Sequence, residues 1–469
     1  MLRKELNPVL MTALVIGATV GSGIFVLPGS LAESAGPASI ISFLLAAFGS
    51  YGLAYVFAEL GIRSPVSNGL YEYPKQAFGD MIGAINGWCY WIFMWSGISA
   101  VLIGLMGYLA LWWPALADNG WLQLILGTIL LWIFTFINTR KVEVGATWGL
   151  VFTIIKVGGL IVLIIVGLFH IDFSNFAPFM PMGSGSIIPT MALLFWSFVG
   201  IETAVTVGEE ADDPKTIRKS TFNALFTIII VYGLILFVAF GAMPSAELAE
   251  SQKPLSDLAR LFMGDFGANF IAIIAVCSII GVMNNTILLT GRTSYAIARD
   301  GLFPQVFSKT NKYGVPSGNI ILGSVLANIL LFTAVFKTLR AAFDFVLLFS
   351  TLFCLIPYVF TMVSMVILYN RKPEMFHFEG SQWTKVKIMA VIGFVFSGLG
   401  IWGAGADALV WALVFIVIMA PLFYAFVTIE RDRIKAKISN SHAGNPFPRL
   451  KKSLSGRKRP PSCPGARQV

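Results

Sequence analysis

Apolar positions in this chain fall in long runs, not in short alternating segments. Twelve runs of mostly apolar residues follow one another, separated by short polar turns. A helix needs about 20 such residues to cross the hydrocarbon core of a bilayer. The pattern therefore predicts an all-α membrane protein with twelve transmembrane helices. The predicted spans are residues 9–30, 38–61, 81–112, 121–138, 147–169, 186–208, 220–243, 266–296, 317–336, 341–369, 385–404 and 408–428.

Glycines interrupt the first of these runs. Residues 17–29 read GATVGSGIFVLPG, with Gly21, Ser22 and Gly23 adjacent. Glycine weakens a helix interior, and lipid offers no partner for freed backbone groups, so a broken span has to be buried in protein or line a watery cavity. The half-helix after the break would point free N–H groups and a partial positive charge into that cavity, which suits a carboxylate. The alternative is that these small residues only let helices pack closely.

The sixth run, residues 186–208, is interrupted in a similar way. It meets Gly200, Ile201 and Glu202 near mid-membrane depth. Because the interrupted runs are the first and the sixth spans, five positions apart, they cross the membrane in opposite directions. Interrupted spans at matching places in two oppositely oriented halves indicate an inverted-repeat transporter. We predict a five-plus-five inverted repeat with broken helices 1 and 6, and a substrate held by the freed backbone groups of both breaks. A carboxylate at one half-helix and an ammonium at the carbonyls would be the two ends of an amino acid.

Lys156 is the one basic residue deep inside a predicted span, far from both of its ends. A lysine at the centre of a membrane helix costs about 2.5–3.5 kcal/mol on insertion scales. Its ammonium has to find carbonyl oxygens or a cavity, or lose its proton. Lys156 is therefore a candidate for proton coupling, and the alternative is a structural role in which it donates to the broken ends of neighbouring helices.

Composition and charge support a membrane protein and set its orientation. The 469 residues are 57% hydrophobic and 12% charged, with a mean hydropathy of +0.79, whereas a soluble domain is about 25% charged. Apart from Lys156, 28 basic residues fall on one side and 4 on the other. Basic residues favour the cytoplasmic side, so we expect both termini there and a location in the cell membrane. The net charge of +9 thus follows from topology and does not indicate a nucleic-acid partner.

Neither the 4 cysteines nor the 3 histidines are spaced as metal ligands or paired catalytic groups. We therefore expect no metal, no cofactor and no enzymatic activity. The tail over residues 430–469 is basic and proline-rich, and we expect it to be a disordered cytoplasmic end.

Four motifs make the chain resemble the amino acid–polyamine–organocation transporters, a family of amino-acid permeases and antiporters with a five-plus-five inverted-repeat fold. The motifs are GSGIFVLPG at 21–29, PVSNGLYEY at 65–73, FWSFVGIETAVTVGEEADDP at 195–214 and SYAIARDGLFP at 294–304. The resemblance runs from Asn7 to about Glu430, and it is much more specific for the family than for the substrate.

The resemblance implies substrate-binding residues on both breaks. The N–H groups around Ser22 and Gly23 would bind the α-carboxylate, and the carbonyls of Thr19, Trp196 and Val199 would take the α-amino group. The full expected set is Thr19, Gly21, Ser22, Gly23, Trp196, Val199, Gly200 and Ile201.

Gating residues are implied in the same way. Trp196 resembles the aromatic gate that closes over substrate from the outside. Glu202 matches the gating and proton-linked acid of the arginine/agmatine-type antiporters, and Tyr90 and Tyr358 match their distal gate tyrosines.

The chain also departs from those antiporters. Ile98 stands where they have an asparagine, and Thr286 where they have a tryptophan. Lys156 resembles instead the lysine of proton-coupled and neutral-amino-acid members, which stands in for a sodium ion by linking spans 1 and 8. The pocket is thus less suited to a guanidinium. Asn284 and Asn285 either contact a polar substrate side chain, with Asn285 as the pocket candidate, or bond between helices.

The sequence as a whole predicts a secondary active transporter that moves amino acids by alternating access, as an exchanger or a proton-coupled permease. An arginine/agmatine or polyamine-type antiporter is the alternative, and a non-transporting membrane sensor is the alternative of a different class. The expected partners are an amino acid or amine, the lipid bilayer, protons and a second copy in a homodimer. The transporter domain would span residues 1–429, with repeats at 9–169 and 186–369 and two extra helices at 385–428.

Overall fold

The computed structural model describes residues 6–64, 70–140, 146–376, 378, 381–414, 416–417, 424–425 and 427–429. The chain divides into two compact units, Met1–Val427 and Thr428–Val469, and all elements below belong to the first. Residues 65–69 of the second motif and the basic tail from residue 430 lie outside the described residues.

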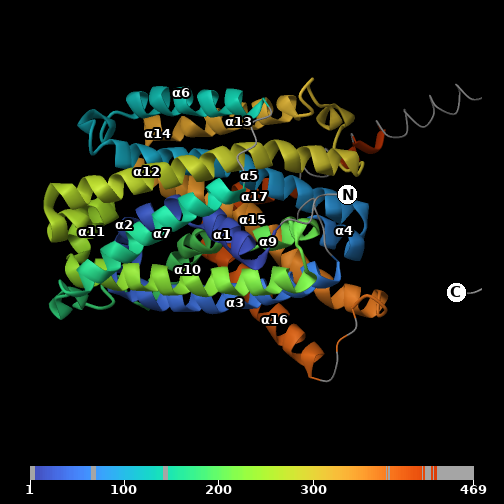
Figure 1. Cartoon of the computed structure of the whole chain (residues 1–469), viewed down its shortest axis with the longest axis horizontal. Coiled ribbons are helices and arrows are strands. Elements are labelled where there is room, and N and C mark those ends of the chain that lie inside the picture. The colour runs from blue at the N-terminus through green and yellow to red at the C-terminus, as the bar shows by residue number, and fades with distance from the viewer. Residues whose placement is uncertain are drawn as a thin grey trace, which may run out of the picture. The chain divides into compact units, whose positions relative to one another are not determined.

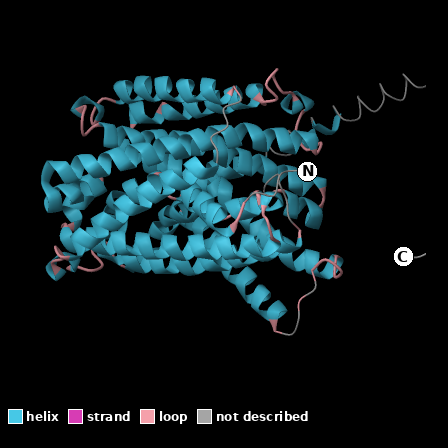
Figure 2. Cartoon of the chain, viewed as in Figure 1, coloured by secondary structure: helices cyan, strands magenta, loops and turns pink. Residues whose placement is uncertain are grey.

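Helices form nearly all of the first unit (Figures 1 and 2), and no strand occurs in the ranges just given. An isolated bridge pairs Leu6 with Ala211. The helices are α1 Pro8–Thr19, α2 Ser22–Ala35, α3 Ser39–Arg63, α4 Glu72–Phe78, α5 Asp80–Leu109, α6 Gly120–Asn138, α7 Ala146–Leu168, α8 Ile187–Phe195, α9 Thr203–Thr206, α10 Pro214–Ala242, α11 Ser245–Glu250, α12 Pro254–Arg299, α13 Ser317–Leu331, α14 Thr333–Phe336, α15 Leu339–Arg371, α16 Gln382–Gly403 and α17 Ala406–Val414, with short 3₁₀ turns that include η5 Trp196–Phe198.

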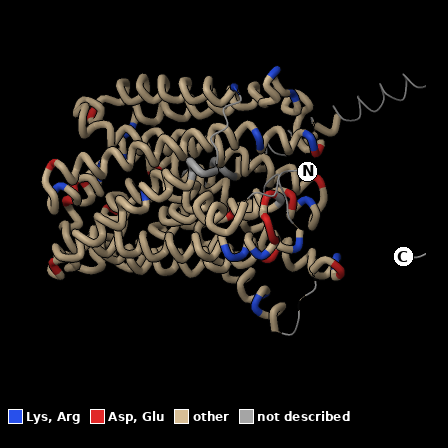
Figure 3. Tube along the Cα trace, in the orientation of Figure 1, with Lys and Arg blue, Asp and Glu red and all other residues tan. Residues whose placement is uncertain are grey.

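Nine helical stretches of the described chain are long and apolar enough to cross a membrane. Lys, Arg, Asp and Glu gather towards the ends of the helices, and the middle carries few of them (Figure 3). The prediction of an all-α membrane protein is therefore confirmed. The first predicted span corresponds to two short helices, α1 and α2, and the sixth to α8, η5 and α9. The last predicted span, 408–428, is only partly described.

Local sequence explains where several helices begin and bend. Asn7 caps α1, because its side-chain oxygen accepts from the N–H groups of Val9 and Leu10 at 3.0 Å each. The helix α12 begins 12 residues before the predicted span at 266, and it bends at Gly264, which has φ +63°. Only glycine adopts that conformation without strain.

The helices α5 and α15 are the most deeply buried long helices of the described chain. In its most apolar window α5 is 94% buried, whereas α6 is 28% and α16 is 33% buried, so the latter two lie at the surface of the unit. The helix α5 packs against both α12 and α15, and α6 runs beside α13 at the edge (Figure 1). Trp91 and Trp95 of α5 are buried against the rings of Phe303 and Phe349.

Candidate functional site

The first break separates α1 from α2. The helix α1 ends at Thr19, and α2 begins at Ser22, so Val20 and Gly21 form the non-helical connection. The break is fully inside the protein, with Thr19 5% and Ser22 1% exposed. The first N–H groups of α2 have no carbonyl partner within their own helix, and they are the donors on which the carboxylate prediction rests.

Lys156 of α7 holds this break from one side. Its Nζ donates to the carbonyl oxygens of Gly17 and Val20, both at 2.8 Å. The Val20 carbonyl also accepts from the hydroxyl of Ser278 on α12 at 2.9 Å. A buried ammonium thus satisfies carbonyls that the break has freed, and one carbonyl joins α7, the break and α12.

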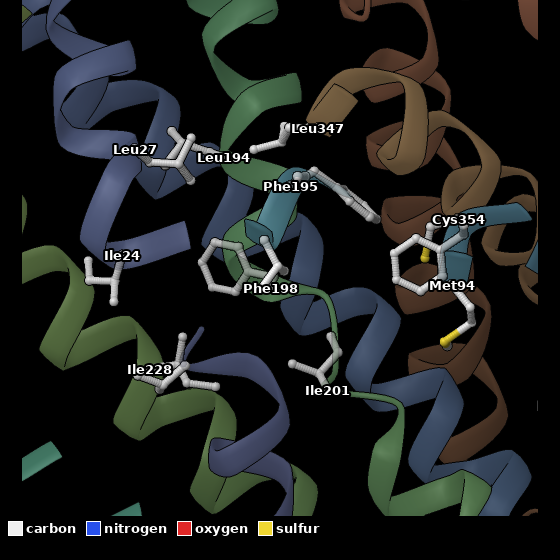
Figure 4. Packing of buried hydrophobic residues seen from close by; sticks show 14 of the residues in the cluster. Ile24, Leu27, Met94, Leu194, Phe195, Phe198, Ile201, Ile228, Leu347 and Cys354 are labelled. Atoms are coloured by element: carbon white, nitrogen blue, oxygen red, sulfur yellow. The ribbon is translucent and has the colours of Figure 1, made fainter. Parts of the chain in front are cut away.

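The second break follows η5. Val199 is extended and Gly200 has φ +107°, before the chain turns through Ile201 and Glu202 into α9. Figure 4 shows this non-helical trace near Phe198 and Ile201. A Cβ on Gly200 would lie 2.7 Å from Thr19 Oγ1 and 3.2 Å from Thr19 Cα and N. The absence of a side chain at Gly200 therefore lets the two breaks touch.

Glu202 is buried at the second break among three donors. Its Oε2 accepts from the Tyr358 hydroxyl at 2.6 Å and from the backbone N–H of Gly200, two residues earlier in the chain, at 2.9 Å. Its Oε1 accepts from the Tyr90 hydroxyl at 3.3 Å. The predicted gate residues Tyr90, Glu202 and Tyr358 are thus brought together. Through them the break is tied to α5 and α15.

Trp196 lies between the two breaks. Its Nε1 donates to the Ser22 hydroxyl at 3.4 Å, and its ring meets that of Phe93 edge to face at 6.2 Å. Added Cβ atoms on Gly23 and Gly97 would lie 3.1 and 3.2 Å from opposite edges of the indole. The indole therefore occupies a slot between two glycines, one on α2 and one on α5.

Comparison with known proteins agrees with this geometry. The family described as "Amino acid permease" matches residues 6–430. The chain belongs to the amino acid permease family. It is therefore a multi-pass membrane transporter and not an enzyme.

Three relatives of this permease illustrate the match. A Bacillus subtilis protein, provisionally named an arginine/ornithine antiporter, is 32% identical over 75% of this chain and 81% of its own length. The arginine/ornithine antiporter of Pseudomonas aeruginosa is 27% identical over 90% of each chain. The arginine/agmatine antiporter of Chlamydia abortus is 25% identical over 90% of this chain and 89% of its own.

The remaining predicted pocket residues of the permease lie on α5 and α12. Ile98 is fully buried, and the Thr286 hydroxyl donates to the Val282 carbonyl of its own helix at 2.8 Å. Asn284 accepts from Asn138 of α6 at 2.7 Å, so it bonds between helices. The side chain of Asn285 is exposed.

Two sets of hydrogen bonds join helices at opposite ends of the permease. At one end Asp300 accepts from the Tyr71 hydroxyl and from Lys75 Nζ, both at 3.1 Å. Burial and the nearby Asp300 raise the pKa of Tyr71 well above its usual range, so the phenol stays a donor. At the other end Asp344 of α15 accepts from the Ser30 hydroxyl of α2 at 2.7 Å. These hydrogen bonds link α4 to the end of α12 at one end of the bundle and α2 to α15 at the other.

Sequence reasoning missed Gly97, Ser278 and Tyr232, whose hydroxyl donates to the Thr19 carbonyl at 3.3 Å. Each lies in an ordinary apolar run, and only the fold reveals its contact.

Gly97→Ala is expected to raise the half-saturation concentration for uptake about tenfold, because overpacking a filled slot costs about 1–3 kcal/mol and pushes Trp196 towards the break. Uptake in proteoliposomes measures this. Gly281→Ala is the control, since a Cβ at Gly281 of α12 meets nothing within 4 Å. Wild-type kinetics in Gly97→Ala would show that the indole does not need the slot.

Proposed function

We propose that this permease moves amino acids by alternating access, with one substrate held between the two breaks. The main support is that the two breaks are in contact: Gly200 packs against Thr19, and Trp196 donates a hydrogen bond to Ser22. Helix ends that meet inside a membrane protein leave backbone groups free for an ion or a charged substrate, which is how broken-helix transporters bind their cargo.

In this proposal the N–H groups of Ser22 and Gly23 take the carboxylate. The carbonyls of Thr19, Trp196 and Val199 take the ammonium, with Gly21, Gly200 and Ile201 shaping the backbone. The Thr19 carbonyl already accepts from Gly21 N–H at 2.9 Å and from Tyr232. A carbonyl has two lone pairs, so substrate binding at Thr19 has to displace or bend one of these bonds.

The packing of the helices supports a five-plus-five inverted repeat. If spans 1 to 5 correspond to spans 6 to 10, each contact in the bundle should have an exchanged counterpart. In this pairing α1 corresponds to α8, α3 to α10, α5 to α12, α6 to α13 and α7 to α15. The contact of α1 with α10 therefore corresponds to the contact of α8 with α3, and the contact of α1 with α7 corresponds to that of α8 with α15. Likewise α5 with α15 corresponds to α12 with α7, and α5 with α13 to α12 with α6.

We extend the proposal to twelve spans, with repeats at 9–169 and 186–369, extra helices at 385–428, cytoplasmic termini and a location in the cell membrane. The excess of 28 basic residues over 4 on the side of the termini supports this orientation.

The relatives named for arginine and ornithine make basic amino acids the first substrates to test. Ile98 and Thr286 favour a less polar side-chain pocket, because one is apolar and the other is bonded to its own helix. Proton-coupled uptake of a neutral amino acid is therefore the second candidate, with Lys156 and Glu202 as the groups that carry or sense the proton.

Uptake of a panel of labelled amino acids into proteoliposomes tests the proposal. Vesicles are preloaded with an amino acid or left empty, with and without an inward proton gradient. Uptake that needs an internal amino acid and ignores the gradient indicates an exchanger. Accumulation in empty vesicles that needs the gradient indicates a proton symporter. If no amino acid or amine enters in any condition, the proposal is wrong.

A further inference from the structure

A polar cavity lies away from the two breaks. It has a volume of about 240 Å³ and is lined by the α5–α6 connection, the α11–α12 turn and the α14–α15 turn. In the proposed topology this is the outer end of the permease. The polar lining includes Asp118, Gln123, Gln252, Lys337 and Thr338.

Two amide oxygens in the lining have no hydrogen-bond donor in the described chain. Gln123 is 2% exposed, and its Nε2 donates to the Leu116 carbonyl at 2.7 Å. That bond fixes which end of the amide is nitrogen, and Oε1 is left buried without a partner. Gln252 donates to the Ala117 carbonyl at 3.4 Å, and its Oε1 is also buried and unpartnered. Each such oxygen costs about 1–3 kcal/mol unless something donates to it.

The charges and the size of the cavity indicate what could donate. One water occupies about 30 Å³, so a cavity of about 240 Å³ holds several waters or a small organic molecule. Two carbonyl oxygens and the Asp118 carboxylate suit an ammonium or a guanidinium, both of which only donate. The Lys337 ammonium on the same lining suits a carboxylate.

The cavity shares one lining residue, Gln252, with a small void nearer the first break. This void lies between α2, α5 and α15, and Gly104 and Arg340 also line it. A Cβ on Gly104 would lie 3.4 Å from Ser22 Cβ, so this void borders the carboxylate end of the central site. One guanidinium nitrogen of Arg340, Nη1, is buried without an acceptor. Gln252 and Arg340 are the polar residues of this void, and Val26, Ile103, Leu339 and Phe343 make the rest of its lining mostly apolar.

We propose that the cavity is an outer binding site for a free basic amino acid, occupied before the central site. The side-chain ammonium or guanidinium contacts Oε1 of Gln123 and Gln252 with Asp118 beside them, and the α-carboxylate contacts Lys337. The proposal rests on the proposed function, and it adds a first contact that selects for cationic substrates on one side of the membrane only.

Opposite substitutions of Gln252 test the outer site. Labelled arginine exchange is measured from outside in intact cells and from inside in inverted vesicles. Gln252→Leu is expected to raise the outer half-saturation concentration about tenfold, since one bond to a charged group is lost. Gln252→Glu is expected to lower it, because a carboxylate replaces the amide oxygen. The inner half-saturation concentration and the maximal rate should stay within about twofold of wild type.

A matched pair of acids controls for general electrostatics. Asp118→Asn is expected to weaken outer binding, whereas Asp265→Asn, an 86% exposed acid that pairs with Arg260 and does not line the cavity, should change nothing. Equal effects of the two acid variants would reduce Asp118 to general surface charge and overturn the proposal. The proposal would also be overturned if the Gln252 variants left the outer half-saturation concentration unchanged, or shifted the outer and inner half-saturation concentrations equally.

Failure of the proposed function has a separate outcome. If the wild type exchanges no amino acid, equilibrium dialysis of labelled arginine against the purified full-length protein tests whether the outer site binds arginine without transport. Binding that Gln252→Leu removes and Gly200→Ala spares supports the outer site on its own. Absence of such binding overturns it.

Discussion

Lys156→Met is expected to reduce amino-acid uptake at least about 100-fold while changing the melting temperature of the purified protein little. The substitution removes two hydrogen bonds from a buried ammonium to Gly17 and Val20, both 2.8 Å long. Bonds to charged groups contribute about 1.5–3 kcal/mol each, and a 100-fold change in rate corresponds to about 2.7 kcal/mol. Stability is affected less, because removing the lysine also removes an insertion cost of about 2.5–3.5 kcal/mol.

Exchange and proton-driven accumulation distinguish the two roles of Lys156. If the ammonium only holds the first break in shape, Lys156→Met lowers both activities equally. If it carries the proton, accumulation under a gradient disappears while exchange between preloaded vesicles survives. Thr153→Val is the matched control, since it removes a neutral bond from α7 to the Ala13 carbonyl of α1, 3.1 Å long. Unimpaired uptake by Lys156→Met in both assays would contradict any role at the break.

The two interrupted spans could be predicted from sequence because glycine and polar residues are costly inside a lipid-facing helix. Gly21–Gly23 and Gly200–Glu202 broke an otherwise apolar pattern, and the structure ends helices beside both. The contacts of Lys156 followed from the same argument, since a buried ammonium needs oxygen atoms and a break supplies them.

Other parts of the site could not be predicted, because they depend on which helix faces meet. Gly97 is one of 45 glycines, and nothing in its neighbourhood reveals that the Trp196 ring lies against it. Asn284 and Asn285 are adjacent and chemically identical, but helix geometry turns one towards α6 and leaves the other exposed. The outer cavity joins three turns that are distant in sequence, and no local pattern brings Gln123 near Gln252.

Gly200→Ala is expected to lower uptake at least about tenfold and also to lower the melting temperature. The φ of +107° at this position disfavours any side chain, at a cost of about 1–3 kcal/mol. The new methyl group would also lie 2.7 Å from Thr19 Oγ1 and 3.2 Å from Thr19 backbone atoms. Backbone cannot move aside as a flexible side chain does, so the two breaks have to separate.

A double substitution separates the strain from the clash. Thr19→Ala removes the hydroxyl nearest to the new methyl group but leaves the backbone conformation of Gly200 and the Thr19 backbone contacts unchanged. Thr19→Ala with Gly200→Ala should therefore recover part of the uptake lost in Gly200→Ala, and the part not recovered measures the strain and the backbone contact.

Gly158→Ala is the control for the Gly200 series, because a Cβ at Gly158 of α7 meets nothing within 4 Å and alanine is the better helix former by about 1 kcal/mol. It should retain uptake and melt no lower than wild type. If Gly200→Ala behaves like Gly158→Ala, the two breaks do not have to touch for transport. A substrate held jointly by Thr19 and Val199 would then be excluded, because those residues could separate without loss of function.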